Sequence, residues 1–184
     1  MAAEPLRQIV YMVVTVVGCW FGMQAVHELG HCLGAWITGG RVQRVVLHPL
    51  TISRTDLDAN PHPLVVAWAG PIAGGVLPLL AWVARAPTRS VGRRAANHGS
   101  LRFSSSLCWF LRLFAGFCLI ANGLYIGLGS FGAIGDCGDM LRHGSQPWQL
   151  WLFGLFTAPL GLYLWHGLGP RLGFVSAPAS TSSN

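Results

Sequence analysis

The stretch "AVHELGHCLG", Ala25–Gly34, places two histidines and a glutamate inside a long apolar segment. That segment runs from residue 9 to residue 37, and Glu28 is its only formally charged residue. About 20 apolar residues are enough for a helix to cross a hydrocarbon core of ~30 Å. Ionisable groups at such a depth are costly and usually face a functional interior. The stretch therefore predicts a transmembrane helix that carries a polar site.

Three further apolar segments follow it, over residues 64–84, 107–134 and 148–168. The whole chain has only 10% charged residues, against roughly 25% in soluble domains. Its mean hydropathy is +0.50. We therefore expect an all-α membrane protein with four transmembrane helices, at residues 9–37, 64–84, 107–134 and 148–168, within a single domain of residues 1–170.

The connections between these segments differ in kind. Between the first two, "GGRVQRVVLHPLTIS" mixes β-branched and polar residues, which predicts a small β-hairpin at the membrane surface. The next part of that connection, "RTDLDANP", is typical of a polar turn. Residues 85–102 hold five arginines and predict a solvated loop. The tail, residues 171–184, has the composition of a disordered segment.

The charge of the chain indicates a lipid bilayer as its partner. Its formal net charge is +6, and all of the basic residues are arginines that lie mostly between apolar segments. Such charge is typical of membrane-flanking loops, and we expect no binding to nucleic acid. The five cysteines form no CxxC pair, which favours buried free thiols over disulfides.

His27, Glu28 and His31 match the pattern HExxH. Two histidines four residues apart lie on one face of a helix and can bind one zinc ion, Zn²⁺. Glu28 is then placed to take a proton from water activated by the metal. The alternative is that these polar groups only join helices through hydrogen bonds. Metal binding is the better hypothesis, because ionisable groups are rare in such segments.

A zinc site of this kind needs a third protein ligand. The extended pattern HExxHxxGxxH is excluded, because residue 37 is isoleucine, and the only other glutamate is Glu4. Four aspartates remain as candidates: Asp56, Asp58, Asp136 and Asp139. The first two lie in the turn-like "RTDLDANP", where exposure to solvent explains them. The last two lie in the glycine-rich "IGDCGDM", where the backbone can bend toward the first helix, and we favour this pair.

The order of three motifs resembles the site-2 protease family of intramembrane zinc metalloproteases. The motifs are "HELGH" in the first segment, "AGPIAG" (Ala69–Gly74) in the second and the Asp-containing, glycine-rich stretch after the third. The resemblance implies a zinc metalloendopeptidase of the bacterial cytoplasmic membrane that hydrolyses peptide bonds of membrane-spanning protein substrates. It also implies a core of three helices, with HExxH on the first and a metal-binding Asp on the third. From the residues alone, the glycines of "AGPIAG" predict close helix packing.

The resemblance also implies roles for single residues. His27 and His31 would be zinc ligands, Glu28 the general base, and Asp136 the third ligand. The LDG-type motif of the family is incomplete here, because Gly135 stands in place of its leucine and Cys137 in place of its glycine. Asp139 therefore stays open as the alternative ligand, and so does a Cys137 thiolate.

Asn122, in "IANGLYIG", is similar to a family asparagine that binds the substrate backbone. A hydrogen bond between helices is the other explanation for Asn122. For the chain as a whole, the alternative function is a non-proteolytic membrane protein that binds metal or regulates partners on the same fold.

Overall fold

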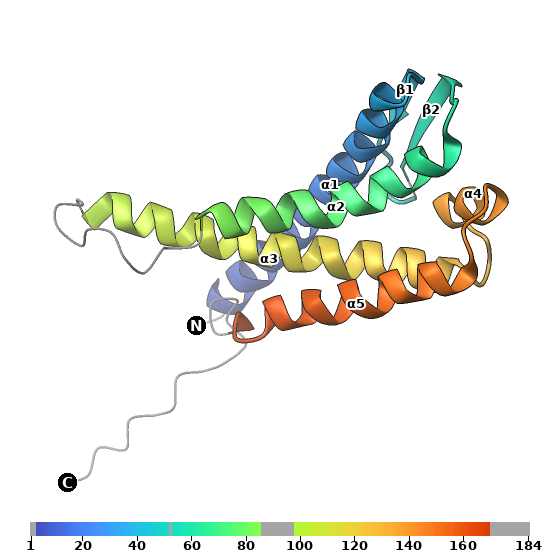
Figure 1. The fold of residues 1–184 in the computed structure, drawn as a ribbon. Coiled ribbons are helices and arrows are strands. Elements are labelled where there is room, and N and C mark those ends of the chain that lie inside the picture. Colours follow the sequence, from blue (N-terminus) through green and yellow to red (C-terminus); the bar gives the residue numbers. More distant parts are fainter. Residues whose placement is uncertain (1–2, 52, 86–97, 170–184) are drawn as a thin grey trace, which may run out of the picture.

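The computed structural model describes residues 3–51, 53–85 and 98–169, and the statements below concern this part of the chain. Its elements, in chain order, are α1 (Ala3–Ile37), β1 (Arg41–Val46), β2 (Arg54–Ala59), α2 (Pro63–Arg85), α3 (His98–Gly129), α4 (Asp136–Arg142) and α5 (Pro147–Trp165). Helices α2, α3 and α5 run side by side, and α1 crosses them obliquely (Figure 1). The hairpin and α4 lie at the same end of this bundle.

Three helices are long and apolar enough to cross a membrane: Leu6–Ile37, Pro63–Arg85 and Ser106–Gly129. They coincide with the first three predicted segments. The fourth predicted segment folds as α5, which is 19 residues long but is not among these candidates. Its tryptophans and Gln149 lower its hydropathy, and a fourth crossing therefore stays a prediction.

Two predicted boundaries differ from the structure. The third helix ends at Gly129 instead of residue 134, because a turn with glycines leads into α4. Residues 98–102, predicted as part of a loop, are the first turn of α3. The remainder of that loop from residue 86 and the predicted disordered tail of residues 171–184 lie outside the described residues.

Small residues let the helix pairs approach closely, as is common where lipid removes the hydrophobic drive between helices. A Cβ added to Gly30 of α1 would lie 2.4 Å from the carbonyl oxygen of Ala69 in α2. A Cβ added to Gly161 of α5 would lie 2.6 Å from the carbonyl oxygen of Gly116 in α3. Backbone thus packs against backbone in both pairs.

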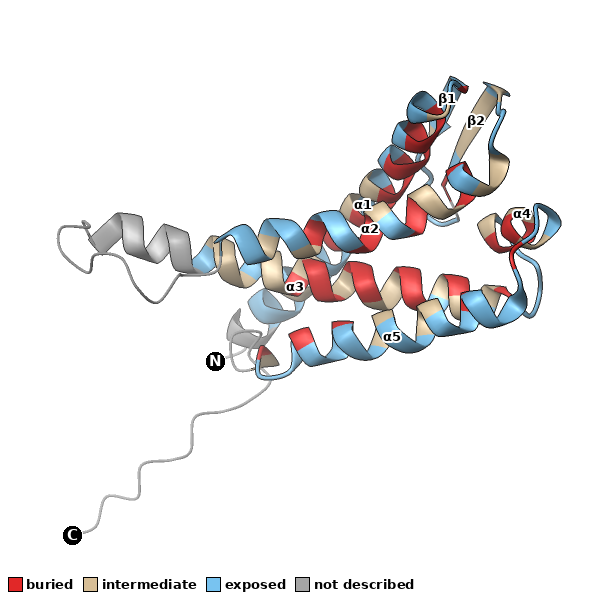
Figure 2. Ribbon diagram, viewed as in Figure 1, coloured by how far each residue is buried: buried red, intermediate tan, exposed pale blue. Residues whose placement is uncertain are grey.

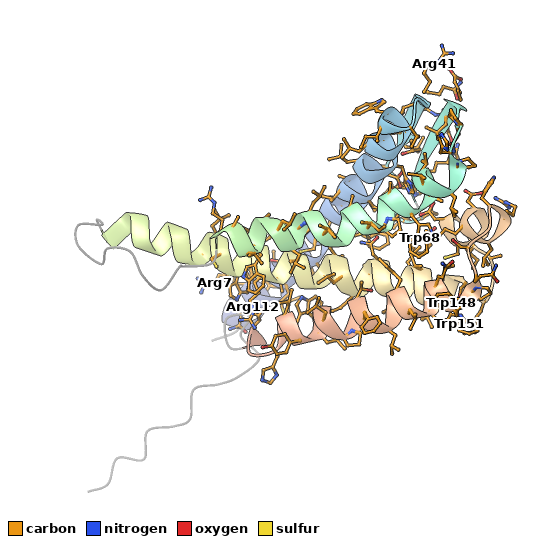
Figure 3. All side chains as sticks on the ribbon, in the orientation of Figure 1. Arg7, Arg41, Trp68, Arg112, Trp148 and Trp151 are labelled. Carbon is orange, nitrogen blue, oxygen red and sulfur yellow. The ribbon has the colours of Figure 1, made fainter. Side chains whose placement is uncertain are left out.

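The buried residues gather where α1, α2 and α3 meet, while the outer faces expose large apolar side chains (Figure 2). In water such faces would be a liability, but in a bilayer they contact lipid. Trp148 and Trp151 lie at the α4 end of α5, and Arg7 and Arg112 lie toward the other end of the bundle (Figure 3). Tryptophans and arginines near helix ends are typical of membrane interfaces.

Strands β1 and β2 form a two-stranded antiparallel hairpin, with Arg41 opposite Ala59 and Val46 opposite Arg54. The hairpin predicted between the first two helices is therefore present. The prediction that "RTDLDANP" is a turn is wrong for its first six residues, which form β2. Asp56 stabilises this strand pairing by accepting from Arg44 across the hairpin at 2.8 Å, and such opposite-charge pairs favour neighbouring strands.

The start of β2 and the turn before it are held against α1. The indole Nε1 of Trp20 donates to the carbonyl oxygen of Pro49 at 3.0 Å. The hydroxyl of Ser53 donates to the side-chain oxygen of Gln24. These contacts place the hairpin directly over the HELGH turn of α1.

Candidate metal centre

His27 and His31 are both buried on the face of α1 that looks toward α2, α3 and α4. His31 Nδ1 lies 2.8 Å from the backbone carbonyl oxygen of Val66 in α2. His27 Nδ1 lies 2.7 Å from Asn122 Oδ1 in α3. The amide of Asn122 is oriented by its Nδ2, which donates to the carbonyl oxygen of Cys118 at 2.9 Å. Because both partners are oxygens that only accept, each Nδ1 carries the ring proton.

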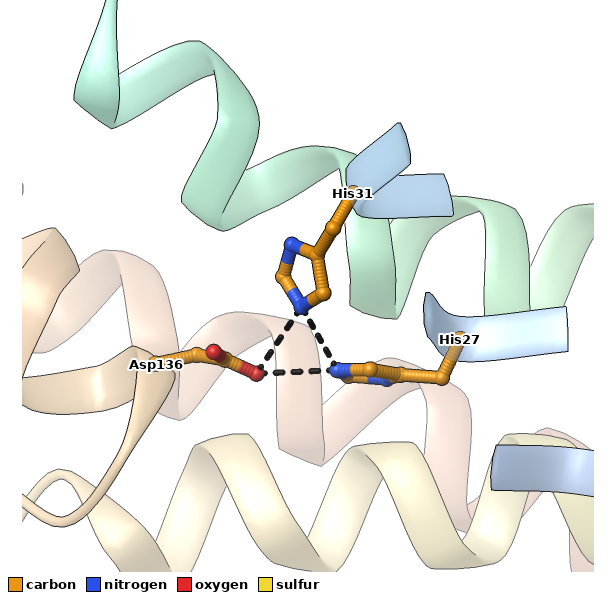
Figure 4. Close-up of side chains that lie close together, drawn as sticks. All are labelled: His27, His31 and Asp136. Atoms are coloured by element: carbon orange, nitrogen blue, oxygen red, sulfur yellow. Dashed lines mark hydrogen bonds and ion pairs between the residues drawn. The ribbon is translucent and has the colours of Figure 1, made fainter. Parts of the chain in front are cut away.

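The two Nε2 atoms consequently turn their lone pairs inward (Figure 4). These two Nε2 atoms lie 3.0 Å apart. Asp136 Oδ2 lies 2.8 Å from Nε2 of His27 and 3.4 Å from Nε2 of His31. Three electron-rich atoms at such distances repel one another unless a cation lies between them. Two imidazole nitrogens and one carboxylate oxygen, within 4.8 Å of one another, are also the donor types of a catalytic zinc site. These three residues therefore fit a zinc ion.

Asp136 reaches this position through the turn after α3. Gly135 has φ +54°, a left-handed conformation, and a Cβ at this position would lie 2.1 Å from the hydroxyl oxygen of Tyr125. That hydroxyl accepts a hydrogen bond from the backbone N–H of Asp136 at 3.1 Å. The departure from a leucine at residue 135 thus has a local cause, since only glycine fits both the backbone angle and the tyrosine.

The surroundings also tune the acidity of this carboxyl. Burial raises the pKa of Asp136, but the two neighbouring imidazoles of His27 and His31 outweigh burial and lower the pKa overall. The carboxylate is therefore ionised at neutral pH, as a metal ligand must be.

The alternative ligands lie elsewhere. Asp139 pairs with Arg142 on the surface of α4, where its side chain is 47% exposed. Cys137 is fully buried in an apolar cluster with Ile126 and Met140, and burial raises the pKa of its thiol to about 11. The structure brings Asp136 to the two histidines, and among the described residues it brings neither of these two alternatives there.

A comparison with protein families bears on this arrangement. A family model described as Peptidase M50B-like matches residues 8–162, which include all three residues of the candidate metal centre. The chain belongs to this family. It is thus a member of the site-2 protease family, as its motifs suggested. No curated protein and no solved structure matched the chain. Family membership and three apolar helices together indicate an integral membrane protein.

Glu28, the candidate general base of this M50B-like chain, is only 3% exposed. The hydroxyl of Thr55 in β2 donates to its Oε2 at 2.7 Å. The hairpin therefore fixes the carboxylate of Glu28 beside the two histidines. Sequence reasoning did not find Thr55, because a hydroxyl in an exposed-looking "RTD" gives no sign of what it contacts.

The glycines of "AGPIAG" have a role that the sequence-based interpretation missed. A Cβ on Gly70 would lie 2.3 Å from His31 Nε2, the atom that faces the metal position. A Cβ on Gly74 would lie 2.8 Å from Asn122 Nδ2. The predicted close packing is present, but the groups that fill these recesses are the polar side chains of His31 and Asn122. Of the sequence patterns, only the family motif AGPIAG pointed to these two glycines.

Asn122 holds His27 across the boundary between α3 and α1, and it is 2% exposed. This geometry supports the alternative explanation, a hydrogen bond between helices, and gives it a consequence for the site. An outer partner on Nδ1 fixes the tautomer and the orientation of a metal-binding imidazole. A substrate-binding role for Asn122 stays a prediction.

The metal centre opens onto a cleft of about 730 Å³ between the hairpin and α4. Its wall includes His31, Thr55, Tyr125 and Asp136, together with polar residues of β2. A site meant for hydrolysis must admit water, and this cleft supplies a polar path to it from the side of the hairpin.

Proposed function

We propose that the protein is an intramembrane zinc metalloprotease that hydrolyses peptide bonds of membrane-spanning protein substrates. The observation that carries this proposal is the convergence of His27, His31 and Asp136, with both imidazole tautomers set, directly beside a buried Glu28. We place the enzyme in the bacterial cytoplasmic membrane. We also propose that residues 1–170 form one domain in which α5 is the fourth transmembrane helix.

His27 Nε2, His31 Nε2 and a carboxylate oxygen of Asp136 would hold the zinc ion. Three protein ligands leave a coordination position open, which is the arrangement of catalytic rather than structural zinc sites. A zinc ion held there supplies Lewis-acid polarisation of water and of the scissile carbonyl. Asn122 and the carbonyl of Val66 keep the two imidazoles aimed at it.

Glu28 acts as the general base. Its Oε2 accepts from Thr55, and we assign the other carboxylate oxygen to the proton that leaves water as the water attacks the carbonyl. The same carboxyl then delivers that proton to the leaving amine, so that one group serves both halves of the hydrolysis. Its burial suits this exchange, because a desolvated carboxylate is a better base.

The cleft beside β2 favours an extended peptide as substrate. A helical peptide shields its carbonyls with its own hydrogen bonds, so the cleaved segment has to unwind before attack. Arg54, Thr55 and Leu57 of β2 line the cleft, and an extended peptide can pair with the exposed edge of such a strand. Strand pairing would satisfy the polar backbone that unwinding exposes.

Glu28→Gln tests the proposal, because the amide has nearly the same size but cannot act as a base at neutral pH. We expect this variant to keep stoichiometric zinc and to lose cleavage by about 10²–10⁴-fold, the usual contribution of a general base. The assay pairs zinc analysis of purified protein with complementation of a deletion strain, and His27→Ala serves as the variant that loses the metal. Full rescue by Glu28→Gln would reject the protease and favour a metal-binding or regulatory protein.

A further inference from the structure

A second cavity, of about 170 Å³, is lined by Glu28, which does not line the cleft. Ser53 and Tyr125 line both spaces, so the cavity directly adjoins the cleft. Its wall is mostly apolar, with Trp20 and Met23 from α1 and Ala121 from α3. The candidate base and His27 are among the polar residues that line it. The mechanism proposed above does not use this cavity.

Gln24 also lines this cavity. It is 4% exposed, one helical turn before Glu28 on the same face of α1. Its side-chain oxygen accepts from Ser53, but its Nε2 is buried and has no hydrogen-bond partner among the described residues. A buried donor without a partner has a cost in stability. Such a group is retained at that cost where a ligand completes it.

We propose that this cavity is a specificity pocket for one apolar side chain of the peptide substrate, next to the scissile bond, and that Gln24 Nε2 donates to a backbone carbonyl of that substrate. The inference rests on the proposed protease function and names the substrate feature that it recognises. A cavity of roughly 150 Å³ with apolar walls holds a molecule of the size of benzene, so the space suits leucine, methionine or phenylalanine. Its place beside Glu28 sets the occupant next to the bond that is cut.

Gln24 can replace the hydrogen bonds that a substrate carbonyl loses when it enters the pocket. A peptide carbonyl that enters an apolar, water-poor pocket leaves its hydrogen bonds with water behind, and an unsatisfied backbone group is strongly unfavourable in hydrocarbon. The Gln24 amide, fixed by Ser53 at its oxygen, offers a donor whose orientation is already set. The pocket thus matches an apolar side chain and the polar backbone that carries it.

The test uses zinc-loaded full-length protein in micelles and a library of synthetic peptides. Each peptide has arginine ends and a varied apolar centre drawn from Ala, Val, Leu, Met and Phe, and mass spectrometry locates the cleaved bonds. For the wild type we expect Leu, Met or Phe to be enriched at one position beside the cut. Ala121→Leu fills the pocket and should shift that position toward Ala by about tenfold or more. Met23→Ala enlarges it and should shift the preference the other way, toward Phe.

Gln24→Met removes the amide and keeps the length of the side chain. We expect kcat/KM to fall by about three- to tenfold for all peptides, with the side-chain preference and zinc content unchanged. Ser53→Ala is the matched control, since it breaks the Gln24–Ser53 hydrogen bond but keeps Nε2. Ser53→Ala should therefore lose less than Gln24→Met, and an unchanged kcat/KM in Gln24→Met would overturn the role of the Gln24 amide.

Binding separates this inference from the proposed function. In the Glu28→Gln background, anisotropy of a labelled Leu-centred peptide should show about tenfold weaker binding after Ala121→Leu, and an Ala-centred peptide should bind unchanged. Glu28-dependent cleavage with no preference at any position, or with the same preference in both pocket variants, overturns the pocket alone. Peptide binding that depends on Ala121, without cleavage by the wild type, overturns the protease and keeps the pocket as a binding site.

Discussion

The two halves of α1 have similar apolar compositions but opposite surroundings. In the N-terminal half, Val13, Val14 and Val16 are all more than half exposed. In the C-terminal half, His27, Glu28 and His31 are almost fully buried. Figure 2 shows the same change along one continuous helix, from an exposed stretch to a stretch covered by its neighbours.

The difference shows where a membrane helix can carry polar groups. Most side chains of the exposed half face lipid in a bilayer, and a histidine among them would lose its hydrogen bonds. The covered half meets the carbonyl of Val66, the amide of Asn122 and the hydroxyl of Thr55, which come from three other elements. These three partners offset the cost of desolvating His27, His31 and Glu28.

The largest expected effect concerns the ligand that α4 adds to the covered half. Asp136→Asn keeps the size of the side chain and removes its charge, whereas Asp139→Asn makes the same change three residues away. We expect the first variant to weaken zinc binding by more than the roughly 10–100-fold typical of a lost outer partner. The second should bind zinc as the wild type does, measured by competition with a chromogenic chelator. Loss of zinc in Asp139→Asn alone would make Asp139 the third ligand.

A smaller effect is expected where α3 orients His27. Asn122→Leu removes the acceptor for Nδ1–H and should weaken zinc binding by about 10–100-fold. Asn122→Asp keeps an acceptor at the same place and should retain most of the affinity in the same chelator competition. If both variants lose affinity equally, Asn122 acts through packing against Gly74 and not through the imidazole.

The smallest expected effect is on the free energy of unfolding, when one glycine in each half of α1 is replaced by alanine. A Cβ at Gly30 would meet the backbone of α2, whereas a Cβ at Gly18 would meet nothing within 4 Å. Gly30→Ala should therefore lower the free energy of unfolding by about 1–3 kcal/mol, as overpacking does. Gly18→Ala should change it by less than about 1 kcal/mol, and in the stabilising direction, because alanine favours a helix. Thermal unfolding in micelles measures both, and equal melting temperatures would show that α1 and α2 do not pack as described.

Much of the site was predictable from the chain because its chemistry is local. His27, Glu28 and His31 share one helical turn, and the spacing alone puts the two imidazoles on one face. The apolar runs predicted the three long helices for a similar reason, since hydropathy acts within a segment. The fourth run predicted the helix α5 as well, although its tryptophans and Gln149 lower its hydropathy and leave its membrane crossing a prediction.

The tertiary structure decided what depends on distant residues. Two aspartates three residues apart were both open as ligands, and the turn held by Tyr125 and Gly135 carries Asp136, not Asp139, to the histidines. The sequence pattern predicted a turn where β2 forms, because the strand that pairs with it, β1, lies earlier in the chain. The recess at Gly70 exists only because His31 of another helix fills it. The sequence by itself determined which groups can bind a metal and which segments are apolar, because both follow from neighbours along the chain; only the tertiary structure decided which groups meet, because that depends on how the helices pack.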